Sequence, residues 1–327
     1  MVEPGGPAPV APLRFAGLAL EARIGLGGSA DVWRGVDGEG RAIACKRLMP
    51  HLRADRDARL RLAREANALQ ALAGAAVPTW IAGDVDADVP WIATALVSGP
   101  TWKQLRGASS AVRALAVQGL WRALATLHSR GWLHGDLAPG NVAVDADGRT
   151  VLLDLGLSRS VALSAQGDDD LAYPTPAFAS PEVARGQRAA SASDVFAAAS
   201  LSHWLLVGAS PVPERAGAAL RAALASDPPA IAPRAEALTA ALDTDGAALL
   251  RRCWASRPME RPSVAEVLAR LGPIVDCRVG ASDPDALRQA ARDYAPRLGA
   301  LPVQAAEDRA EVVTGDDDAG AARALVE

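Results

Sequence analysis

Short hydrophobic runs alternate with polar residues over the first third of the chain, from about Phe15 to Val97. Such runs, interrupted by glycine and aspartate, are typical of strands in a small antiparallel sheet. One longer segment, Asp55–Leu72, instead repeats its apolar residues at helical spacing. We expect strands over Leu18–Ile24, Ala30–Val36, Ala42–Leu48, Thr79–Gly83 and Trp91–Val97.

The pattern changes after Gly99-Pro100-Thr101, where alanine- and leucine-rich segments predict helices. A Gly-Pro pair interrupts regular structure, so this tripeptide is a candidate hinge between two lobes. Val195–Pro213 is uncharged, but its glycine and prolines leave a helix too short to cross a bilayer, and we expect it to be buried. Helices are expected over Ala111–Ser129, Ser193–Val207, Ala216–Leu224, Ala247–Arg252 and Ser263–Leu271.

The two ends of the chain differ from its middle. Met1 to Pro12 is rich in proline and glycine and has no basic start before an apolar run, which predicts a flexible leader rather than a signal peptide. After Pro273, one amphipathic stretch near Asp285–Tyr294 precedes sequence rich in aspartate and alanine. We therefore expect a leader over 1–14, a folded domain over 15–272, and a partly helical or disordered tail over 273–327.

Composition limits the classes of partner. The chain has 327 residues, half of them hydrophobic, which is enough for two lobes with a sizeable core. Its 34 basic and 38 acidic residues give a net charge of −4 without a long basic run, so nucleic acid is not an expected partner. Three scattered cysteines fit neither a disulfide framework nor a metal site and indicate reduced thiols in a cytoplasmic protein. Because the uncharged segment Val195–Pro213 is too short to cross a bilayer, no membrane span is expected.

Lysine and asparagine are scarce. The chain has only two lysines, Lys46 and Lys103, and two asparagines, Asn67 and Asn141. A planar guanidinium cannot replace a compact ammonium among phosphates without rearrangement. The scarcity therefore marks Lys46 and Asn141 as candidate functional residues.

The segment His134–Asn141 carries the strongest chemical signal. It contains Asp136 and Asn141, and Asp154 follows the apolar run Val151-Leu152-Leu153, which would deliver its carboxylate as part of a strand. Asp136 could orient and deprotonate an attacking hydroxyl, whereas Asn141 and Asp154 offer oxygen ligands to a magnesium ion (Mg²⁺) on ATP. Each piece alone could be a simple turn, but their order favours a phosphotransfer site.

A glycine-rich segment, Ile24 to Val32, lies between two expected strands. Gly25, Gly27 and Gly28 would let backbone N–H groups approach phosphate oxygens. An isolated glycine cluster is more often a hairpin turn. This one, however, precedes the strand residue Lys46, which is the order expected of a phosphate-binding loop and its lysine.

Glu65 interrupts the apolar stripe of its predicted helix, which it shares with Leu62 and Leu69. A buried carboxylate needs a cationic partner, because an unpaired charge in the interior is strongly destabilising. We expect Lys46 to be this partner. The alternative is a surface pair with Arg61, one turn earlier.

Taken together, these motifs resemble those of the eukaryotic-like serine/threonine protein kinases of bacteria. The resemblance extends from about Leu18 to Leu271 and includes segments without a chemical role. Thr175–Glu182 resembles the end of an activation segment, and Arg257–Ser263 resembles a late arginine motif. The resemblance implies an α+β, bilobal protein-kinase-like fold, with a small antiparallel N-lobe over 15–98 and a larger α-helical C-lobe over 99–272.

The resemblance also implies roles for single residues. Asp136 would be the catalytic base, Lys46 would hold the ATP phosphates and Glu65 would orient Lys46. Asn141 and Asp154 would bind Mg²⁺. The residues implied to contact ATP are Ile24, Gly25, Gly27, Gly28, Val32, Ala44, Lys46, Ala95 and Val97. For the apolar strand residues among them, core packing is an equally good explanation.

Three positions away from the chemistry follow from the same resemblance. Glu182 and Arg261 would form a buried ion pair. Asp194 would open the central helix of the larger lobe.

Two positions depart from the family pattern. Gly135 stands where an arginine usually precedes the catalytic aspartate, and Ala138 stands where a lysine usually neutralises the γ-phosphate. The expected function is transfer of the ATP γ-phosphate to a serine or threonine hydroxyl of a protein substrate. The departures keep open a pseudokinase or nucleotide-binding scaffold with little turnover. A likeness of the loop to aminoglycoside kinases keeps open a small-molecule phosphotransferase.

Overall fold

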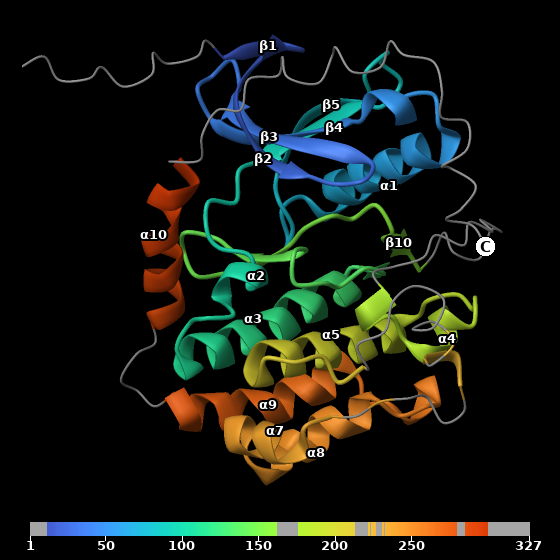
Figure 1. The fold of residues 1–327 in the computed structure, drawn as a ribbon, viewed down its shortest axis with the longest axis vertical. Helices are drawn as coiled ribbons and strands as arrows, with labels where there is room; N and C mark the ends of the chain where they lie inside the picture. The colour runs from blue at the N-terminus through green and yellow to red at the C-terminus, as the bar shows by residue number, and fades with distance from the viewer. Residues whose placement is uncertain are drawn as a thin grey trace, which may run out of the picture.

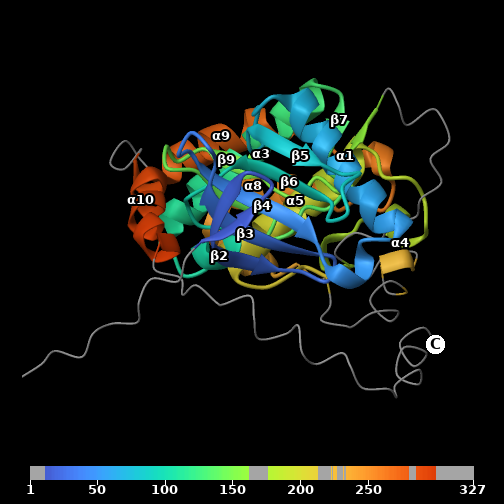
Figure 2. The same ribbon diagram turned by 90° about the horizontal axis from the view of Figure 1, so that it is seen from above.

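The computed structural model describes residues 12–161, 176–212, 222, 224–226, 231, 233–279 and 285–299. Figure 1 shows a sheet-containing lobe above a larger group of helices, and Figure 2 shows the sheet lying over the helical lobe. The predicted bilobal α+β fold is confirmed.

A six-stranded antiparallel sheet forms the smaller lobe, in the order β1-β2-β3-β4-β6-β5. In β4, Ile43 and Cys45 are fully buried, whereas the residues between and after them face the other side of the sheet. The strands are β1 (Leu13–Phe15), β2 (Leu18–Leu26), β3 (Ala30–Val36), β4 (Ala42–Leu48), β5 (Trp80–Asp84) and β6 (Trp91–Ala95).

Strand β1 begins before residue 15, where the sequence placed the start of the folded domain. The ring of Phe15 packs edge-on against Trp91, with 5.8 Å between their centroids, and the guanidinium of Arg47 lies 5.0 Å from the Phe15 centroid. Leu13 and Arg14 therefore belong to the sheet rather than to the leader. Residues 1–11 lie outside the described part of the chain.

Helix α1 (Arg56–Leu72) packs against the sheet. The carboxylate of Asp55 caps the helix by accepting a hydrogen bond of 2.7 Å from the N–H of Ala58. The helix ends at Ala73, which adopts a left-handed conformation. The helix predicted from the apolar spacing is confirmed, and Glu65 lies on its buried face with 7% of its surface exposed.

The larger lobe is organised around helix α5 (Ser191–Val207), which is buried on nearly all sides as its uncharged sequence predicted. No helix in the described residues has both the length and the apolar character required to span a membrane. The expected helix over 216–224 lies mostly outside the described residues. The other helices are α2 (Trp102–Leu105), α3 (Ser110–Ser129), α4 (Pro181–Ala184), α7 (Ala235–Leu242), α8 (Thr244–Cys253) and α9 (Val264–Val279).

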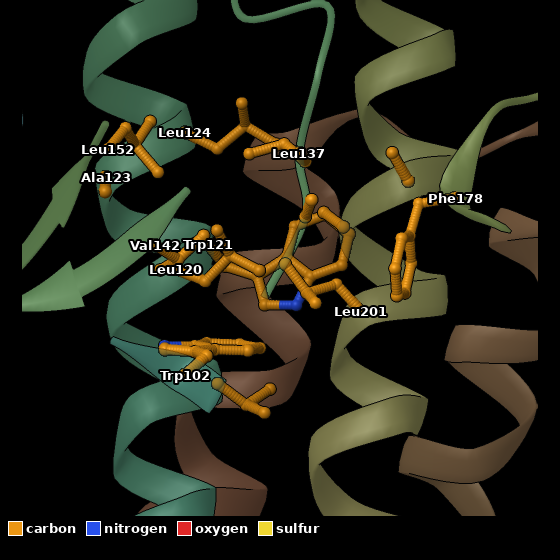
Figure 3. Close-up of a cluster of buried hydrophobic side chains, with 14 of the residues drawn as sticks. Trp102, Leu120, Trp121, Ala123, Leu124, Leu137, Val142, Leu152, Phe178 and Leu201 are labelled. Atoms are coloured by element: carbon orange, nitrogen blue, oxygen red, sulfur yellow. The ribbon is translucent and has the colours of Figure 1, made fainter. Parts of the chain in front are cut away.

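The core of this lobe lies between α3 and α5 and is shown in Figure 3. Trp102 and Trp121 are fully buried in it. Burial of a large side chain stabilises the folded state by about 1.5–3 kcal/mol. Leu137, from the segment His134–Asn141, also packs into this core near Leu124. Burial of this side chain fixes the segment on the larger lobe.

Two small antiparallel pairs place the chemical motifs next to one another. Strand β7 (Trp132–Leu133) pairs with β10 (Arg159–Ser160), and β8 (Val142–Val144) pairs with β9 (Thr150–Leu152). The segment His134–Asn141 connects β7 to β8, and Asp154 follows β9. The sheet pairing therefore brings these polar residues to one region.

Helix α10 (Ala286–Gly299) packs beside α3 and β8 at one side of the molecule, as Figure 1 shows. Ala286, Leu287 and Ala291 are buried on its inner face. The amphipathic helix expected near Asp285–Tyr294 is confirmed. Helix α9 also continues through Pro273, beyond the expected end of the domain at 272, and 300–327 lie outside the described residues.

Candidate active site

Lys46 joins two carboxylates that come from different elements. Its Nζ lies 2.7 Å from Oε2 of Glu65 in α1 and 2.9 Å from Oδ1 of Asp154, which follows β9. The Glu65 side chain is 9% exposed. The predicted pair between Lys46 and Glu65 is therefore present, and a third charged group belongs to it.

The charges of this group act on one another. Burial disfavours the ammonium of Lys46, but the charges of Glu65 and Asp154 outweigh burial and raise its pKa. The charge of Lys46 lowers the pKa of the Asp154 carboxyl. Burial, together with the charge of Asp154, raises the pKa of Glu65. The cluster thus keeps a permanent cation next to an ionised aspartate.

The backbone of Asp154 has a φ of 59°, which is unusual for a residue with a side chain. The N–H of the next residue, Leu155, donates a hydrogen bond to Glu65, and the Leu155 side chain is fully buried. The hydroxyl of Ser158 donates to the Leu155 carbonyl at 2.7 Å. These contacts hold the strained residue in place, which is common at functional sites.

Asp136 and Asn141 are joined within their loop. The Asn141 Nδ2 donates to the backbone carbonyl of Asp136 at 2.9 Å and to its Oδ2 at 3.2 Å. The Asn141 N–H donates to the carbonyl of Ala138, and the Leu153 N–H donates to the carbonyl of Asn141. Because Nδ2 is occupied in this way, Oδ1 of Asn141 is the atom that can bind a cation.

Asp194, at the start of α5, supports the loop from beneath. Its carboxylate accepts hydrogen bonds from the N–H groups of His134 at 2.9 Å and Gly135 at 3.0 Å. His128 contacts the same carboxylate through Nε2 at 2.8 Å. Burial opposes its charge, but the bonds from His128 and Gly135 outweigh burial and lower the pKa of Asp194. The sequence located Asp194 but did not indicate these contacts.

Gly135 has a φ of 79°, in the left-handed region that glycine tolerates best. A Cβ at this position would lie 2.7 Å from the carbonyl oxygen of Leu157. The positive φ and the nearby Leu157 carbonyl together explain why residue 135 is glycine. From the sequence alone, Gly135 was visible only as a departure from the arginine usual in the family.

Several of the residues expected to contact a nucleotide share one face of the sheet. Val32 in β3 is directly opposite Lys46 in β4, and Ala44 is two residues before Lys46, so all three side chains share a face. Thr94 in β6 is opposite Ala44. The remaining positions are Ile24 and Gly25 in β2, Gly27 and Gly28 in the turn after it, Ala95 at the end of β6, and Val97 beyond it.

The oxygen donors fit a metal that arrives with phosphate groups. No cluster of three histidine, cysteine, aspartate or glutamate side chains in the described part of the chain could hold a metal ion alone. Asn141 and Asp154 instead offer an amide and a carboxylate, and the Asp154 side chain is 48% exposed. Mg²⁺ commonly uses one or two carboxylates together with phosphate oxygens, so this donor set suits a metal–nucleotide complex.

The buried ion pair implied by the resemblance is confirmed. Arg261 contacts both carboxylate oxygens of Glu182, at 2.7 and 2.8 Å, and also donates to the carbonyl of Ala192 at 2.9 Å. The hydroxyl of Ser193 donates to Glu182 at 2.7 Å. These bonds fix α4, which begins with the last two residues of the segment Thr175–Glu182 that is expected to end an activation loop. Thr175 lies outside the described residues.

Comparisons with known proteins agree with this geometry. The protein kinase domain family matches residues 18–271. A probable serine/threonine-protein kinase, PkwA of Thermomonospora curvata, is 32% identical over 275 residues, covering 83% of this chain and 35% of PkwA. The serine/threonine-protein kinase AfsK of Streptomyces griseus is 34% identical over 206 residues, covering 61% of this chain and 25% of AfsK. The chain thus spans less than half the length of these relatives.

A solved structure shares the fold. The PknI kinase domain of Mycobacterium tuberculosis superposes with a TM-score of 0.60 and 22% identity, over 82% of this chain and 99% of that domain. The family match covers both lobes, so the resemblance to bacterial serine/threonine kinases is confirmed. Membership implies ATP as the phosphate donor and a divalent metal ion. On these grounds, the chain belongs to the protein kinase family.

Proposed function

We propose that this chain is a serine/threonine protein kinase that transfers the γ-phosphate of ATP to a protein hydroxyl. The observation that carries the proposal is a pair of polar groups: Lys46 bonds to Glu65 and Asp154, and Asn141 bonds to Asp136. The hydrogen bond from the Leu153 N–H to the Asn141 carbonyl holds the two groups next to each other. The names of PkwA and AfsK, both serine/threonine-protein kinases, support the choice of acceptor.

In the proposed complex, Lys46 holds the α- and β-phosphates of ATP and Glu65 keeps its ammonium in position. Val32 and Ala44 pack against the adenine ring. The N–H of Ala95 already donates to the carbonyl of Thr79 at 2.8 Å, so Ala95 would contact the base edge through its carbonyl. The glycine-rich turn after β2, at Gly27 and Gly28, would cover the phosphates, since no atom lies within 4 Å of a Cβ position at Gly28.

We assign the metal site to Asn141 and Asp154, and the ion to Mg²⁺. The bound ion would neutralise charge on the transferred phosphate. Lys46 keeps the Asp154 carboxyl ionised at neutral pH, since it lowers its pKa. The bonds from Asn141 Nδ2 to Asp136 leave the amide oxygen as the atom that would bind the ion.

Asp136 is the proposed base. Its Oδ2 is held by Asn141, which fixes the carboxylate relative to the metal site. The carboxylate would accept a hydrogen bond from the incoming serine or threonine hydroxyl and take its proton as the phosphate is transferred. Ala138 lies two residues away and carries no charge, so this position supplies no cation to the transferred phosphate.

Radiolabelled ATP and a generic protein substrate test the proposal. Wild type and Asp136→Asn are compared for incorporation into protein, with nucleotide binding as the control for folding. We expect transfer to fall by about a hundredfold or more, the usual contribution of a positioned base, while binding is retained. Equal incorporation by both proteins would eliminate Asp136-dependent catalysis.

We also propose a cytoplasmic location. The proposed reaction consumes ATP, and the cysteines, Cys45, Cys253 and Cys277, are free thiols. Free thiols are the usual state in a reducing compartment.

A further inference from the structure

Lys103 is the second of the two lysines in the chain, and the proposed chemistry does not use it. It lies in α2, directly after the segment that connects the two lobes, and its side chain is exposed. The neighbouring Trp102 is fully buried in the core of the larger lobe, which fixes α2 in place (Figure 3).

Helix α2 is tied to the loop that holds Asp136 and Asn141. The N–H of Lys103 donates to the carbonyl of Pro139 at 3.1 Å. The Nζ of Lys103 lies 3.2 Å, and its Cε 3.3 Å, from the position that a Cβ would take at Gly140. The ammonium therefore lies over the catalytic loop, in the space that a side chain at residue 140 would fill.

Asp136, four residues before Gly140, is the one acidic residue of the segment His134–Asn141, and α2 itself carries none. The other charged residue of the α2 region, Arg106, is also basic, and its guanidinium donates to the carbonyl of Gly208. Within the described part of the chain, no carboxylate forms an ion pair with Lys103. An exposed cation next to the loop that would receive the acceptor hydroxyl favours an anionic partner.

We propose that Lys103 is a specificity-determining residue, which selects acceptor segments that carry aspartate or glutamate close to the target hydroxyl. This inference rests on the proposed function. Lys103 lies beside Gly140, four residues beyond Asp136, whereas a cation that replaced the lysine missing at Ala138 would have to reach the transferred phosphate. If Lys103 binds the acceptor segment, its replacement changes KM for acidic substrates. If Lys103 instead contacts the transferred phosphate, its replacement changes kcat for every substrate.

Two peptides with the same acceptor serine test the inference, one flanked by aspartate and glutamate and one flanked by asparagine and glutamine. Values of kcat and KM are measured for wild type, Lys103→Gln and Lys103→Glu. We expect wild type to favour the acidic peptide by about threefold to fivefold in kcat/KM, the range for an exposed ion pair. The preference should arise in KM, shrink at high salt and disappear in Lys103→Gln.

Charge reversal makes the test independent of overall activity. Lys103→Glu should disfavour the acidic peptide, and a lysine-flanked peptide should recover the lost KM. Arg251→Gln is the matched control, because Arg251 is an exposed cation in the last turn of α8 and should leave the preference unchanged. Thermal unfolding checks that each variant folds as wild type does.

Different outcomes would contradict the acceptor role of Lys103 and the proposed kinase function. An unchanged preference in both Lys103 variants, or an equal fall in kcat for all peptides, overturns the acceptor role. Failure of wild type to phosphorylate the peptides and the generic protein contradicts the proposed function, and the inference with it.

Discussion

Lys46 has two carboxylate neighbours within hydrogen-bond distance, and each has a separate structural reason to be there. Glu65 is held by the buried face of α1, and Asp154 is held by a strained backbone after β9. The cation compensates the buried charge of Glu65 and lowers the pKa of Asp154. A single ammonium therefore serves both the stability of the smaller lobe and the proposed phosphate chemistry.

Replacement of Lys46 separates these two roles. Lys46→Met leaves Glu65 buried without a cation, and we expect a loss of about 3 kcal/mol in the free energy of unfolding. The double variant Lys46→Met/Glu65→Gln should recover much of this stability, because no buried charge remains. Neither variant should transfer phosphate. Denaturant unfolding measures the stability, and a double variant as unstable as the single one would contradict the role assigned to the pair.

The departure at Gly135 is testable by comparison with a second left-handed glycine. Gly131 has a φ of 74°, but no atom lies within 4 Å of its Cβ position, whereas a Cβ at Gly135 would meet the Leu157 carbonyl. We expect Gly131→Ala to lose about 1 kcal/mol of stability, from backbone strain alone. Gly135→Ala should lose more and should lower activity, because it also displaces the catalytic loop. Equal losses in thermal unfolding would argue against the clash.

At the scale of elements, one ion pair connects the short helix α4 to the segment that precedes α9. Burial raises the pKa of Glu182, but the hydrogen bonds from Arg261 outweigh burial and hold it below its ordinary value of 4.5. A carboxyl with a lowered pKa in the folded state contributes stability above its unfolded pKa, and this contribution is lost as the pH falls through the folded value.

The pH dependence of stability follows from this sign. Wild type should lose stability as the pH falls below about 4.5, in part because Glu182 must be protonated. Glu182→Gln should be less stable at pH 7 and should lose less on acidification, since the variant carries no proton-binding group there. Denaturant unfolding at several pH values provides the measurement. Parallel pH profiles for the two proteins would contradict the lowered pKa.

Helix α10 gives another prediction at this scale. Ala291 is fully buried, and its Cβ lies 3.3 Å from the Cβ position of Gly99 in the segment between the lobes. Ala291→Arg should therefore force α10 away and expose Leu287, at a loss of about 1–3 kcal/mol. Arg292→Ala, on the exposed face, is the control. Hydrogen exchange over α10 measures the displacement, and unchanged protection in Ala291→Arg would contradict the packing.

The sequence predicted the regular elements well where one face of each is buried. Strands Ala30–Val36 and Ala42–Leu48 appear with the expected bounds, and Asp55–Leu72 was found because its apolar residues repeat at helical spacing. Helix α7 was missed, because alanine-rich sequence gives little contrast between its faces. The three-residue strand β1 was missed because it is too short to show a period.

At the scale of the whole molecule, the candidate site depends on contacts between distant segments. The sequence predicted the pair between Lys46 and Glu65 because Glu65 is a carboxylate on the apolar stripe of its helix. The family resemblance implied the pair between Glu182 and Arg261. Neither source could indicate that Lys103 lies over Gly140, because that contact depends on how α2 leaves the connecting segment. Such placements follow from tertiary packing, which local patterns do not encode.

The most direct test of the central claim uses the chain as its own substrate. Wild type is incubated with ATP, Mg²⁺ and an excess of Asp136→Asn that carries a distinguishing mass tag, and phosphorylated residues are mapped by mass spectrometry. We predict phosphoserine or phosphothreonine on the tagged protein only when wild type is present, and none when Asp136→Asn is incubated alone. Phosphate on the Asp136→Asn protein without wild type, or no phosphate on any hydroxyl with it, would contradict the assignment of Asp136 as the base of a serine/threonine kinase.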